Sequence, residues 1–550
     1  MKSLIVTIVA CLLTLNVGLS SSAKILVIIS IPSYSHQIAY QSIWKTLSLL
    51  GHHVTLVTSD PLPEKNLTNL RQIDLSYNYK HIQSINFLEM KGKYSWQNIM
   101  KMYFCEISSI LAESIFNHPD FKKIYTPDSG EKFDLIITEA IITPAIYAFA
   151  HRFQAPLIGT YSLGFLQMSH FAFGNPLLPS HPSTWDINVT GPNIAFWTRV
   201  WNYILTWWHI HVDCHNIFYK PQQEIAEKYL DNIPSIIELQ KNMSIILVNQ
   251  QEEISYTRPN VPNIIHFGGL HIRNNLKPLP KALQEFVDNA SNGFIYVSLG
   301  TNVHPDMFPE NLKNIFFNTL SNLPVKVVWK FTEDFRKISD NIYIAKWFPQ
   351  QEILAHPNLK LFIYQGGLQS TEEAVYSGVP LVGIPVLADQ DMQVNKMVSL
   401  GVCKKVDILE ITREVLNEAI IEVLNNKSYK ENMMNLKKCI EDKPLSNLKK
   451  VIWWIEYVIR HKGAPHLRSS IVDEPWYQRY DTDVIAFLSI KFHETQRIEK
   501  NGAIATMRKG RLYLVKHWKF VQECYHLQTI FQKNDEVIDK IIGKIDSSRP

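Results

Sequence analysis

The stretch that decides the fold is residues 361–376, which read LFIYQGGLQSTEEAVY. Its first four residues form a short apolar run, typical of a strand buried on both faces of a parallel sheet. Gly366 and Gly367 follow, and a helical pattern runs from Ser370 to Tyr376. A glycine turn between a strand and a helix lets backbone N–H groups approach an anion, and the helix dipole favours negative charge there. The stretch therefore predicts an anion site inside an α/β fold.

Short apolar runs of the same kind occur on both sides of this stretch. They cover residues 24–30, 53–58, 133–138, 155–160, 294–299, 325–330 and 380–385. Helical patterns at 38–50 and 281–289 lie between them, and residues 24–58 have the length of one βαβ crossover. We predict two doubly wound, Rossmann-like α/β halves that face a cleft at the carboxyl ends of their strands. The Pro-rich stretch 258–280 is the expected linker.

Composition excludes several classes of protein. The chain has 550 residues, several times the ~100–150 of a typical domain, so two domains are expected. Hydrophobic residues make up 46% and charged residues 19%, which excludes a disordered or fibrous chain. The 55 basic and 51 acidic residues leave a net charge of +4, which demands no nucleic-acid partner. Six cysteines are too few for a disulfide scaffold, and no Cys-x-x-Cys pair indicates zinc.

The first 23 residues are typical of a secretory signal peptide. Lys2 supplies a positive start, residues 4–15 are almost wholly apolar, and residues 21–23 are small. A buried N-terminal strand is the alternative. Glycosylation sequons begin at Asn66, Asn188, Asn242, Asn289 and Asn426. Removal of Cys11 with the leader leaves five cysteines, so in an oxidising compartment at least one thiol is unpaired or pairs outside the chain.

The C-terminal part of the sequence has no segment with the ~18 apolar residues that span a bilayer. The nearest candidate, residues 484–490, ends at Lys491, and the tail 491–550 is polar. We expect a protein of the secretory pathway, in the lumen of the endoplasmic reticulum or secreted. Membrane association stays possible without a clear spanning helix.

Residues 161–219 are unusually rich in aromatic side chains. They include Phe165, Phe171, Phe173, Trp185, Phe196, Trp197, Trp201, Tyr203, Trp207, Trp208 and Phe218. Such density suits the wall of an apolar pocket or a contact with a membrane surface. Ordinary core packing of irregular helices is the third interpretation.

Polar and aromatic residues near the glycine turn suit the parts of a nucleotide-sugar. Trp347, at a strand end, can stack on a flat heterocycle, and the Gln350 amide both donates and accepts, as the edge of uracil requires. Glu373, one turn into the helix, can accept hydrogen bonds from two sugar hydroxyls. Ser370 can donate to a phosphate, and the pair Asp389-Gln390 can receive the hydroxyls of a hexose.

The run from Trp347 to Gln390 closely resembles the signature of the family 1 UDP-glycosyltransferases, the UDP-glucuronosyltransferase group in particular. The resemblance covers roughly residues 24–480 and implies a GT-B fold. It implies an acceptor-binding domain at 24–261, a UDP-sugar-binding domain at 262–445, and C-terminal helices with a pre-membrane segment at 446–490. The implied UDP-sugar ligands are Ser298, Thr301, Trp347, Gln350, Gln365, Gly367, Gln369, Ser370, Glu373, Asp389 and Gln390.

Two of these positions depart from the family pattern. The family usually has His where this chain has Gln365, and often Asn where it has Gln369. Glutamine still donates a neutral hydrogen bond to a phosphate oxygen but cannot become cationic. Stabilisation of the leaving group is therefore expected to be weaker, or to depend more on backbone amides.

His36 and Glu139 are the implied catalytic residues. By resemblance His36, in the loop after the first strand, is the base that takes the proton of the acceptor hydroxyl. A carboxylate normally supports that histidine, usually Asp, and the matching residue here is Glu139. Asp134 is the alternative, but it begins the same strand, ~15 Å or more from the other end at about 3.3 Å per residue.

The resemblance implies an inverting transfer of a hexose, glucose or glucuronate, from its UDP-sugar to a hydroxyl of a small lipophilic acceptor. Neither a metal nor a further cofactor is implied. The alternative is a catalytically weak or inactive member that binds lipophilic ligands or a nucleotide-sugar. A nicotinamide-dependent oxidoreductase is excluded, because no Gly-x-Gly-x-x-Gly follows Ser30. The donor sugar, the acceptor and the oligomeric state, a homo-oligomer among the possibilities, stay open.

Overall fold

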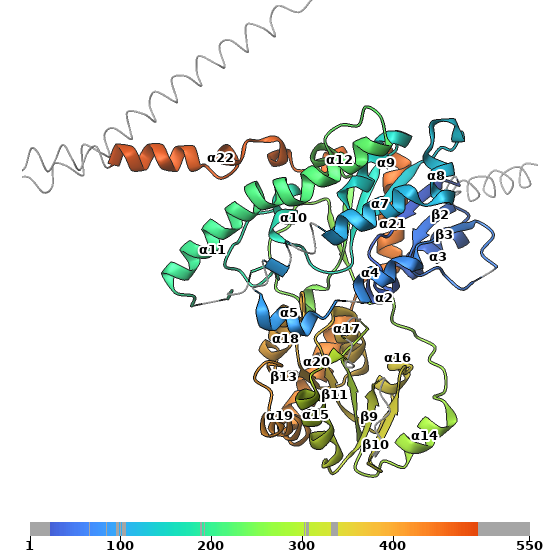
Figure 1. The fold of residues 1–550 in the computed structure, drawn as a ribbon, viewed down its shortest axis with the longest axis vertical. Coiled ribbons are helices and arrows are strands. Elements are labelled where there is room, and N and C mark those ends of the chain that lie inside the picture. The colour runs from blue at the N-terminus through green and yellow to red at the C-terminus, as the bar shows by residue number, and fades with distance from the viewer. Residues whose placement is uncertain are drawn as a thin grey trace, which may run out of the picture. The chain divides into compact units, whose positions relative to one another are not determined.

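The computed structural model describes residues 22–492, apart from residues 65, 84, 95–97, 100, 102–105, 188–189, 192, 302, 304–306 and 332–338. Nearly all of the expected leader and almost the whole polar tail lie outside the described residues, as does the sequon at Asn188. The chain divides into two compact units, one up to Val472 and one from Asp473. The first unit contains both sheets of the protein (Figure 1).

The first sheet has seven strands in the order β3-β2-β1-β4-β5-β6-β7, all parallel. The strands are β1 (Lys24–Ile28), β2 (His53–Thr58), β3 (Leu70–Asp74), β4 (Leu135–Glu139), β5 (Leu157–Tyr161), β6 (Ile245–Asn249) and β7 (Ile264–Phe267). The order of the strands reverses between β1 and β4. In open parallel sheets the crevice outside the carboxyl ends of two such strands is where ligands bind.

The second sheet has six parallel strands in the order β10-β9-β8-β11-β12-β13. The strands are β8 (Phe294–Ser298), β9 (Lys326–Lys330), β10 (Ile342–Ala345), β11 (Leu359–Tyr364), β12 (Leu381–Gly383) and β13 (Cys403–Lys405). Its order reverses between β8 and β11, and the glycine turn of the deciding stretch follows β11. The two predicted Rossmann-like halves are thereby confirmed, and we call them the first and second lobe.

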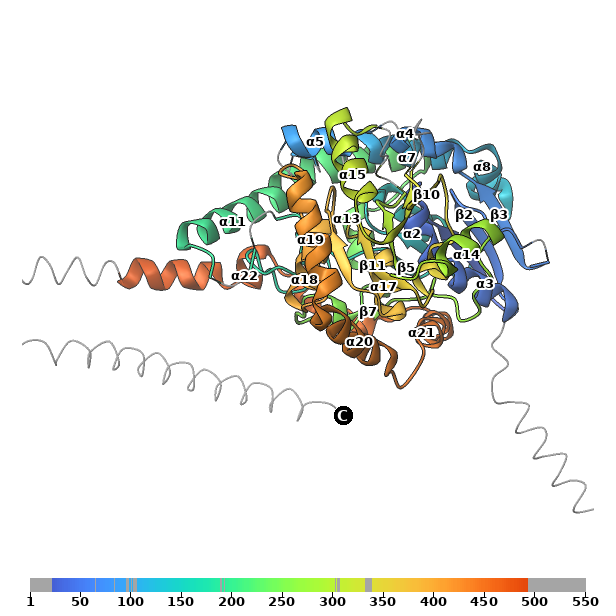
Figure 2. The same cartoon turned by 90° about the horizontal axis from the view of Figure 1, so that it is seen from below.

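Helices cover both faces of each sheet (Figures 1 and 2). The first lobe contains α2 (Tyr34–Ile38), α3 (Gln41–Leu49), α4 (Lys80–Gln83), α5 (Phe87–Lys93), α7 (Ser108–Asn117), α8 (Pro119–Tyr125), α9 (Ala148–Phe153), α10 (Gln167–Ala172), α11 (Phe196–Trp208), α12 (Lys220–Tyr229) and α13 (Ile236–Lys241). The second lobe contains α14 (Lys281–Asp288), α15 (Glu310–Ser321), α16 (Gln350–Leu354), α17 (Leu368–Ser377), α18 (Gln390–Ser399), α19 (Arg413–Asn425) and α20 (Lys427–Glu441).

The first sheet reaches further along the chain than the expected boundary at residue 261. β7 lies inside the Pro-rich stretch that we interpreted as linker, and it pairs in parallel with β6, Ile246 opposite Ile264. The segment that joins the lobes therefore begins after Phe267. A strand of four residues that contains His266 and lies next to prolines gives little signal, because edge strands are short and paired on one side only.

The chain returns to the first lobe after completing the second. α21 (Asn447–His461) buries Val451, Ile455 and Val458 in the same hydrophobic cluster as strands β1, β2 and β6. Figure 1 shows α21, in orange, among the blue elements of the first lobe. The core on one face of the first sheet is therefore completed by residues that follow the second lobe in sequence.

The segment after β1 differs from the prediction. The expected loop 33–37 is the short helix α2, and the helix expected at 38–50 is α3, which begins at Gln41. The buried side chain of Gln37 explains the break, since its amide donates to the carbonyl of Ile31 at 2.8 Å and fixes α2 against the end of β1. His36 thus lies on a helix rather than in a loop.

The aromatic segment 161–219 serves two different structural roles. Phe165, Phe173, Trp185 and Phe218 are buried in the core of the first lobe, as ordinary packing requires. Five aromatic residues of α11 face outward and are each about half or more exposed, namely Phe196, Trp197, Trp201, Tyr203 and Trp208, whereas Trp207 is partly buried. Figure 2 shows α11 extending away from the two sheets.

The described part of the second unit contains α22 (Trp476–Arg479) and a helical stretch at residues 482–492. Across the described residues as a whole, no helix combines the length and the apolar character that a membrane span requires.

Candidate active site

His36 and Glu139 meet where the order of the first sheet reverses. Glu139 is the last residue of β4, and His36 lies on α2 directly after β1, so both side chains reach the carboxyl edge of the sheet. Nδ1 of His36 lies 3.3 Å from Oε1 of Glu139. The glutamate side chain is fully buried, whereas the histidine side chain is 17% exposed. The ring is therefore anchored at one nitrogen by a carboxylate that water does not reach.

Glu139 is held by the loop that follows β1. Its second oxygen, Oε2, accepts a hydrogen bond from the backbone N–H of Ile31 at 2.9 Å and from the Ser30 hydroxyl at 3.4 Å. Ser30 in turn accepts from the Thr143 hydroxyl at 2.7 Å. A buried carboxylate needs such donors, and here they leave Oε1 directed at His36.

Ser162 is a member of this site that the sequence analysis missed. Its hydroxyl contacts Nδ1 of His36 and lies 3.4 Å from Oε1 of Glu139. The strand register accounts for its place, because Thr160 on β5 pairs with Glu139 on β4 and Ser162 is the first residue after β5. A serine just after a predicted strand was the available signal.

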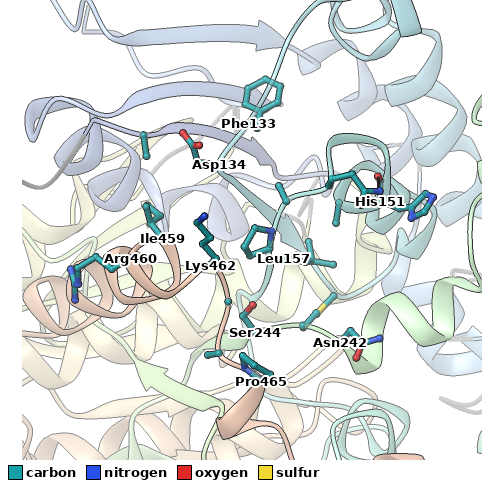
Figure 3. A pocket seen from close by; sticks show the side chains of 18 of the residues that line it. Phe133, Asp134, His151, Leu157, Asn242, Ser244, Ile459, Arg460, Lys462 and Pro465 are labelled. Atoms are coloured by element: carbon teal, nitrogen blue, oxygen red, sulfur yellow. Dashed lines mark hydrogen bonds between the residues drawn. The ribbon is translucent and has the colours of Figure 1, made fainter.

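Asp134, the alternative partner of His36, lies at the other end of β4. Its Oδ2 accepts a hydrogen bond from the backbone N–H of Lys24 at 2.8 Å, at the amino edge of the sheet. A cavity of about 910 Å³ opens at that edge, with Asp134, Leu157, Ser244 and Lys462 among its lining residues (Figure 3). This cavity is therefore separate from the site of His36.

The glycine turn of the second lobe brings two loops into close contact. Gly366 has a φ of +94°, in the left-handed region, and Gly367 caps the N-terminus of α17 without a side-chain bond. Gly300, after β8, has a φ of +81°, and a Cβ there would lie 2.1 Å from Nε2 of Gln365. Gln365 thus packs on the loop that carries Ser298 and Thr301, and its buried Oε1 has no hydrogen-bond partner.

Gln350, Ser370 and Glu373 form one hydrogen-bonded group. Nε2 of Gln350 donates to Oε2 of Glu373 at 2.6 Å and to the Ser370 hydroxyl at 3.0 Å. Tyr296 donates from its hydroxyl to the other end of the Gln350 amide at 3.2 Å. The resemblance assigns Ser370 to the diphosphate, and its hydroxyl here accepts from Gln350, the residue expected at the uracil.

Trp347 lies at the surface between the lobes, with 59% of its area exposed. Its ring contacts the edge of Tyr34, which lies two residues before His36 on α2, with centroids 5.8 Å apart. The Lys330 ammonium lies 4.5 Å above the indole and donates to the carbonyl of Gly300 at 2.9 Å. Burial lowers the pKa of Lys330 to about 8. Lys330, at the end of a predicted strand, is a second residue that the sequence analysis missed.

Asp389 and Gln390 lie together after β12 but are used differently. Burial raises the pKa of Asp389 to about 6, and the charge of nearby His36 partly offsets that rise. Oε1 of Gln390 accepts hydrogen bonds from the backbone N–H groups of Val386 and Leu387, each at 2.9 Å. Gln390 therefore holds its own loop, while the Asp389 carboxyl lies within electrostatic reach of the His36 ring.

The two lobes are also joined directly. Nε2 of Gln369 donates to the backbone carbonyl of Ser162 at 3.3 Å. On α5, Lys91 pairs with Asp391 at 2.9 Å and donates to the Pro385 carbonyl at the same distance. Among the described residues, no group of three or more His, Cys, Asp or Glu side chains has an arrangement that holds a metal ion.

Comparison with known proteins agrees with this architecture. A family model described as "UDP-glucoronosyl and UDP-glucosyl transferase" matches residues 23–501. UDP-glucosyltransferase 2 of Dactylopius coccus is 32% identical over 498 residues, which cover 88% of this chain and 93% of that protein. UDP-glucuronosyltransferase 2B1 of Rattus norvegicus is 31% identical over 485 residues, which cover 83% of this chain and 88% of that protein.

Solved structures of glycosyltransferases share the fold. Os79 from O. sativa, in a complex with a trichothecene, aligns with a TM-score of 0.52 at 15% identity and covers 79% of this chain and 100% of its own. VinC, in a complex with DTDP, aligns with a TM-score of 0.52 at 15% identity, and the alignment covers 80% of this chain and 100% of VinC. The fold is thus GT-B.

The family model extends over both lobes, and relatives above 30% identity align along most of the chain. The chain therefore belongs to the UDP-glucoronosyl and UDP-glucosyl transferase family, and it is a UDP-glycosyltransferase that transfers the glycosyl group of a UDP-sugar to an acceptor.

Proposed function

We propose that this UDP-glycosyltransferase transfers a hexose, glucose or glucuronate, to a hydroxyl group of a small lipophilic acceptor, with inversion at the anomeric carbon. The observation that carries the proposal is the pairing of His36 with the buried Glu139 at 3.3 Å, where the first sheet reverses its order. A histidine held at Nδ1 by a carboxylate has its other nitrogen, Nε2, for an incoming proton.

In the proposed mechanism, Nε2 of His36 takes the hydroxyl proton of the acceptor while the oxygen attacks the anomeric carbon. The new bond forms on the face opposite UDP, the bond from the anomeric carbon to the phosphate oxygen breaks, and UDP leaves with that electron pair. Glu139 stabilises the imidazolium that holds the proton. The N-terminus of α17, after Gly366 and Gly367, stabilises the charge that develops on the diphosphate.

The donor is proposed to bind in the second lobe through the residues that match the family signature. We assign the uracil to Trp347 and Gln350, the ribose to Glu373, and the hydroxyls of the sugar to Asp389 and Gln390. Because Oε1 of Gln390 already accepts from its own loop, its NH₂ group is the part left for the sugar. The diphosphate is assigned to Ser298, Thr301, Gln365, Gly367, Gln369 and Ser370.

The test is release of UDP from UDP-glucose and from UDP-glucuronate in the presence of a panel of phenols. The proposal expects turnover with at least one of these donors and its loss in His36→Ala. Binding of UDP without turnover on any phenol would instead support the alternative of a catalytically inactive binding protein. Full activity in His36→Ala would show that the base is misassigned.

We further propose that the protein enters the secretory pathway and associates with a membrane surface through α11. Trp197, Trp201, Ile204 and Trp208 recur at helical spacing and are 48–76% exposed, whereas Asn202 on the opposite side is buried. Apolar residues thus face outward, the reverse of an ordinary surface helix. α11 contains no acidic residue and one cation, Arg199, and Trp rings suit the boundary between lipid headgroups and acyl chains.

A further inference from the structure

His271 is a buried histidine that the mechanism above does not use. It lies in the segment that joins β7 to α14, where the chain passes between the lobes, and its side chain is only 1% exposed. Its ring faces α17, which Figure 1 shows at the boundary of the second lobe with the first. Two successive carboxylates of that helix, Glu372 and Glu373, lie on either side of the ring.

The contacts of the ring fix where its hydrogens lie. Nε2 is 3.2 Å from the backbone carbonyl of Gln369, and a carbonyl only accepts, so Nε2 carries a hydrogen and donates. Nδ1 faces Oε2 of Glu372 at 3.6 Å, which is too long for a hydrogen bond, and neither atom has a hydrogen-bond partner. Burial raises the pKa of the Glu372 carboxyl beside the ring.

Glu373 is held by Gln351 of α16, a residue that also bonds to the linker segment. Its Oε1 accepts from Nε2 of Gln351 at 3.0 Å and lies 3.7 Å from Nε2 of His271. Gln351 also donates to the backbone carbonyl of His271 at 3.0 Å and accepts from the N–H of Arg273 at 2.9 Å. Gln351 therefore fixes one side of the carboxylate assigned to the ribose and is itself bonded to the linker, while Oε2 of Glu373 accepts from Gln350 on the other side.

Close packing at the start of the segment supports this arrangement. The backbone N–H of Gly269 donates to Oε1 of Glu372 at 2.9 Å, and a Cβ at Gly268 would lie 2.4 Å from that same oxygen. A side chain at residue 268 would push the segment away from α17. The linker and the first turns of the donor helix thus form one rigid block.

We propose that His271 is a positioning residue for the nucleotide, which holds the first turn of α17 against the linker so that Glu373 presents its carboxylate to the two ribose hydroxyls. The inference deepens the proposed function and rests on the assignment of Glu373 to the ribose. It predicts that His271 matters for a nucleotide with ribose hydroxyls and not for one without them.

The experiment compares the affinities of the full-length protein for UDP and for 2′,3′-dideoxy-UDP by calorimetry. His271→Phe keeps a ring of similar size but loses the N–H donor, so affinity for UDP should fall about tenfold, the effect of one good hydrogen bond. Affinity for the dideoxy nucleotide should change less than twofold. His271→Gln, which restores an amide donor, should recover most of the loss, and the KM for UDP-sugar should rise with little change in kcat.

A matched control is His266→Gln, which alters a histidine at β7 whose ring pairs with the exposed Glu252 at 3.0 Å. Its affinity for UDP should equal that of the wild type. If His271→Phe does not fold, His271→Asn, whose shorter amide does not reach the Gln369 carbonyl, gives the same comparison of the two nucleotides.

An equal loss for both nucleotides, or no loss for UDP, would overturn the inference, the first because it marks a merely structural role. On a Glu373→Gln background the His271 substitution should have no further effect on affinity for UDP, and an additive effect would also overturn it. Failure of the wild-type protein to bind UDP at all would instead refute the proposed function.

Discussion

The side-chain amide of Gln369, on the second lobe, donates to the backbone carbonyl of Ser162, on the first lobe, across 3.3 Å. Ser162 also contacts the His36 ring through its hydroxyl. The residue beside the proposed base is therefore tied to the first turn of the helix proposed to hold the diphosphate. This contact therefore joins the lobe that carries the proposed base to the lobe proposed to bind the UDP-sugar.

Gln369→Ala removes that connection and should lower kcat about fivefold, the value of roughly one net hydrogen bond. Because Gln369 is also assigned to the diphosphate, the affinity for UDP, measured by calorimetry, should fall as well. Gln284→Ala, which removes a partly buried glutamine on α14 that donates to Asp288, serves as the control and should leave kcat unchanged. An unchanged kcat in Gln369→Ala would mean that the contact has no part in turnover.

His36→Ala and Glu139→Gln should each lower kcat by about 10²–10⁴, the usual contribution of a positioned general base. Affinity for UDP should stay within about twofold, because neither residue contacts the proposed nucleotide site. Initial rates of UDP release measure kcat, and calorimetry measures the affinity for UDP. His53→Ala, at an exposed histidine on β2 of the same lobe, is the control. Rates near the wild-type value in Glu139→Gln would remove Glu139 from the mechanism.

The prediction of the fold from sequence succeeded for the internal strands of both sheets, with the exception of β6. Its failures are the four edge strands, β3, β7, β10 and β13, and the internal strand β6. Edge strands are short and tolerate polar residues, as β3 does with Arg71 and Asp74, so they lack a continuous apolar signal. β6 carries that signal over Ile245–Val248, and the sequence analysis overlooked it.

The catalytic pair could be predicted because each residue lies near the carboxyl end of a predicted strand. Glu139 ends β4 and His36 lies on the short helix after β1, and the structure brings them together. Ser162 depends on the register of β5 against β4, and His271 depends on how the linker crosses α17, neither of which a single sequence states. The mutual pairing of Gln350 with Glu373 is likewise a tertiary contact.

The raised pKa of Asp389, about 6, predicts a pH dependence of donor binding. Below that pH the carboxyl carries a proton and loses an acceptor for sugar hydroxyls, so the KM for the UDP-sugar should rise, by up to about tenfold per pH unit. Affinity for UDP, which lacks the sugar, should not follow this trend. Steady-state kinetics from pH 5 to 8, at about half-unit steps, test it. Asp389→Asn should abolish the dependence, and a dependence that persists in that variant would assign it to another group.

The raised pKa of Asp389 also predicts how the stability of the protein depends on pH. The ordinary pKa of 3.8 is raised on folding, so the folded state disfavours the charged form. That destabilising effect is absent well below 3.8, grows as the pH rises, and is complete above about 6. Asp389→Asn should therefore have a higher Tm than the wild type at about pH 7.5, by a few degrees, and the difference should shrink toward pH 4. Thermal unfolding followed by circular dichroism measures the Tm of the variant and of the wild type at each pH. A lower Tm for Asp389→Asn than for the wild type at about pH 7.5 would contradict the expectation.

The exposed face of α11 predicts binding to lipid vesicles. Replacement of Trp197, Trp201 and Trp208 together by Ser should lower binding to vesicles of phosphatidylcholine with about 20% phosphatidylserine at least tenfold in a flotation assay, because each Trp loses its interfacial contact. Trp453→Ser, at a half-exposed tryptophan on α21, should leave flotation unchanged. Flotation of the triple variant equal to that of the wild type would exclude α11 as the contact.

The return of α21 to the first lobe limits how this enzyme can be recombined with its relatives. A chimera that exchanges only the N-terminal half would place a foreign sheet against Val451, Ile455 and Val458, which pack on β1, β2 and β6 of this chain. The unit of exchange is therefore discontinuous, residues 22–267 together with 447–472. Libraries built with a single crossover between the lobes should express poorly, whereas libraries with paired crossovers should preserve the shared core.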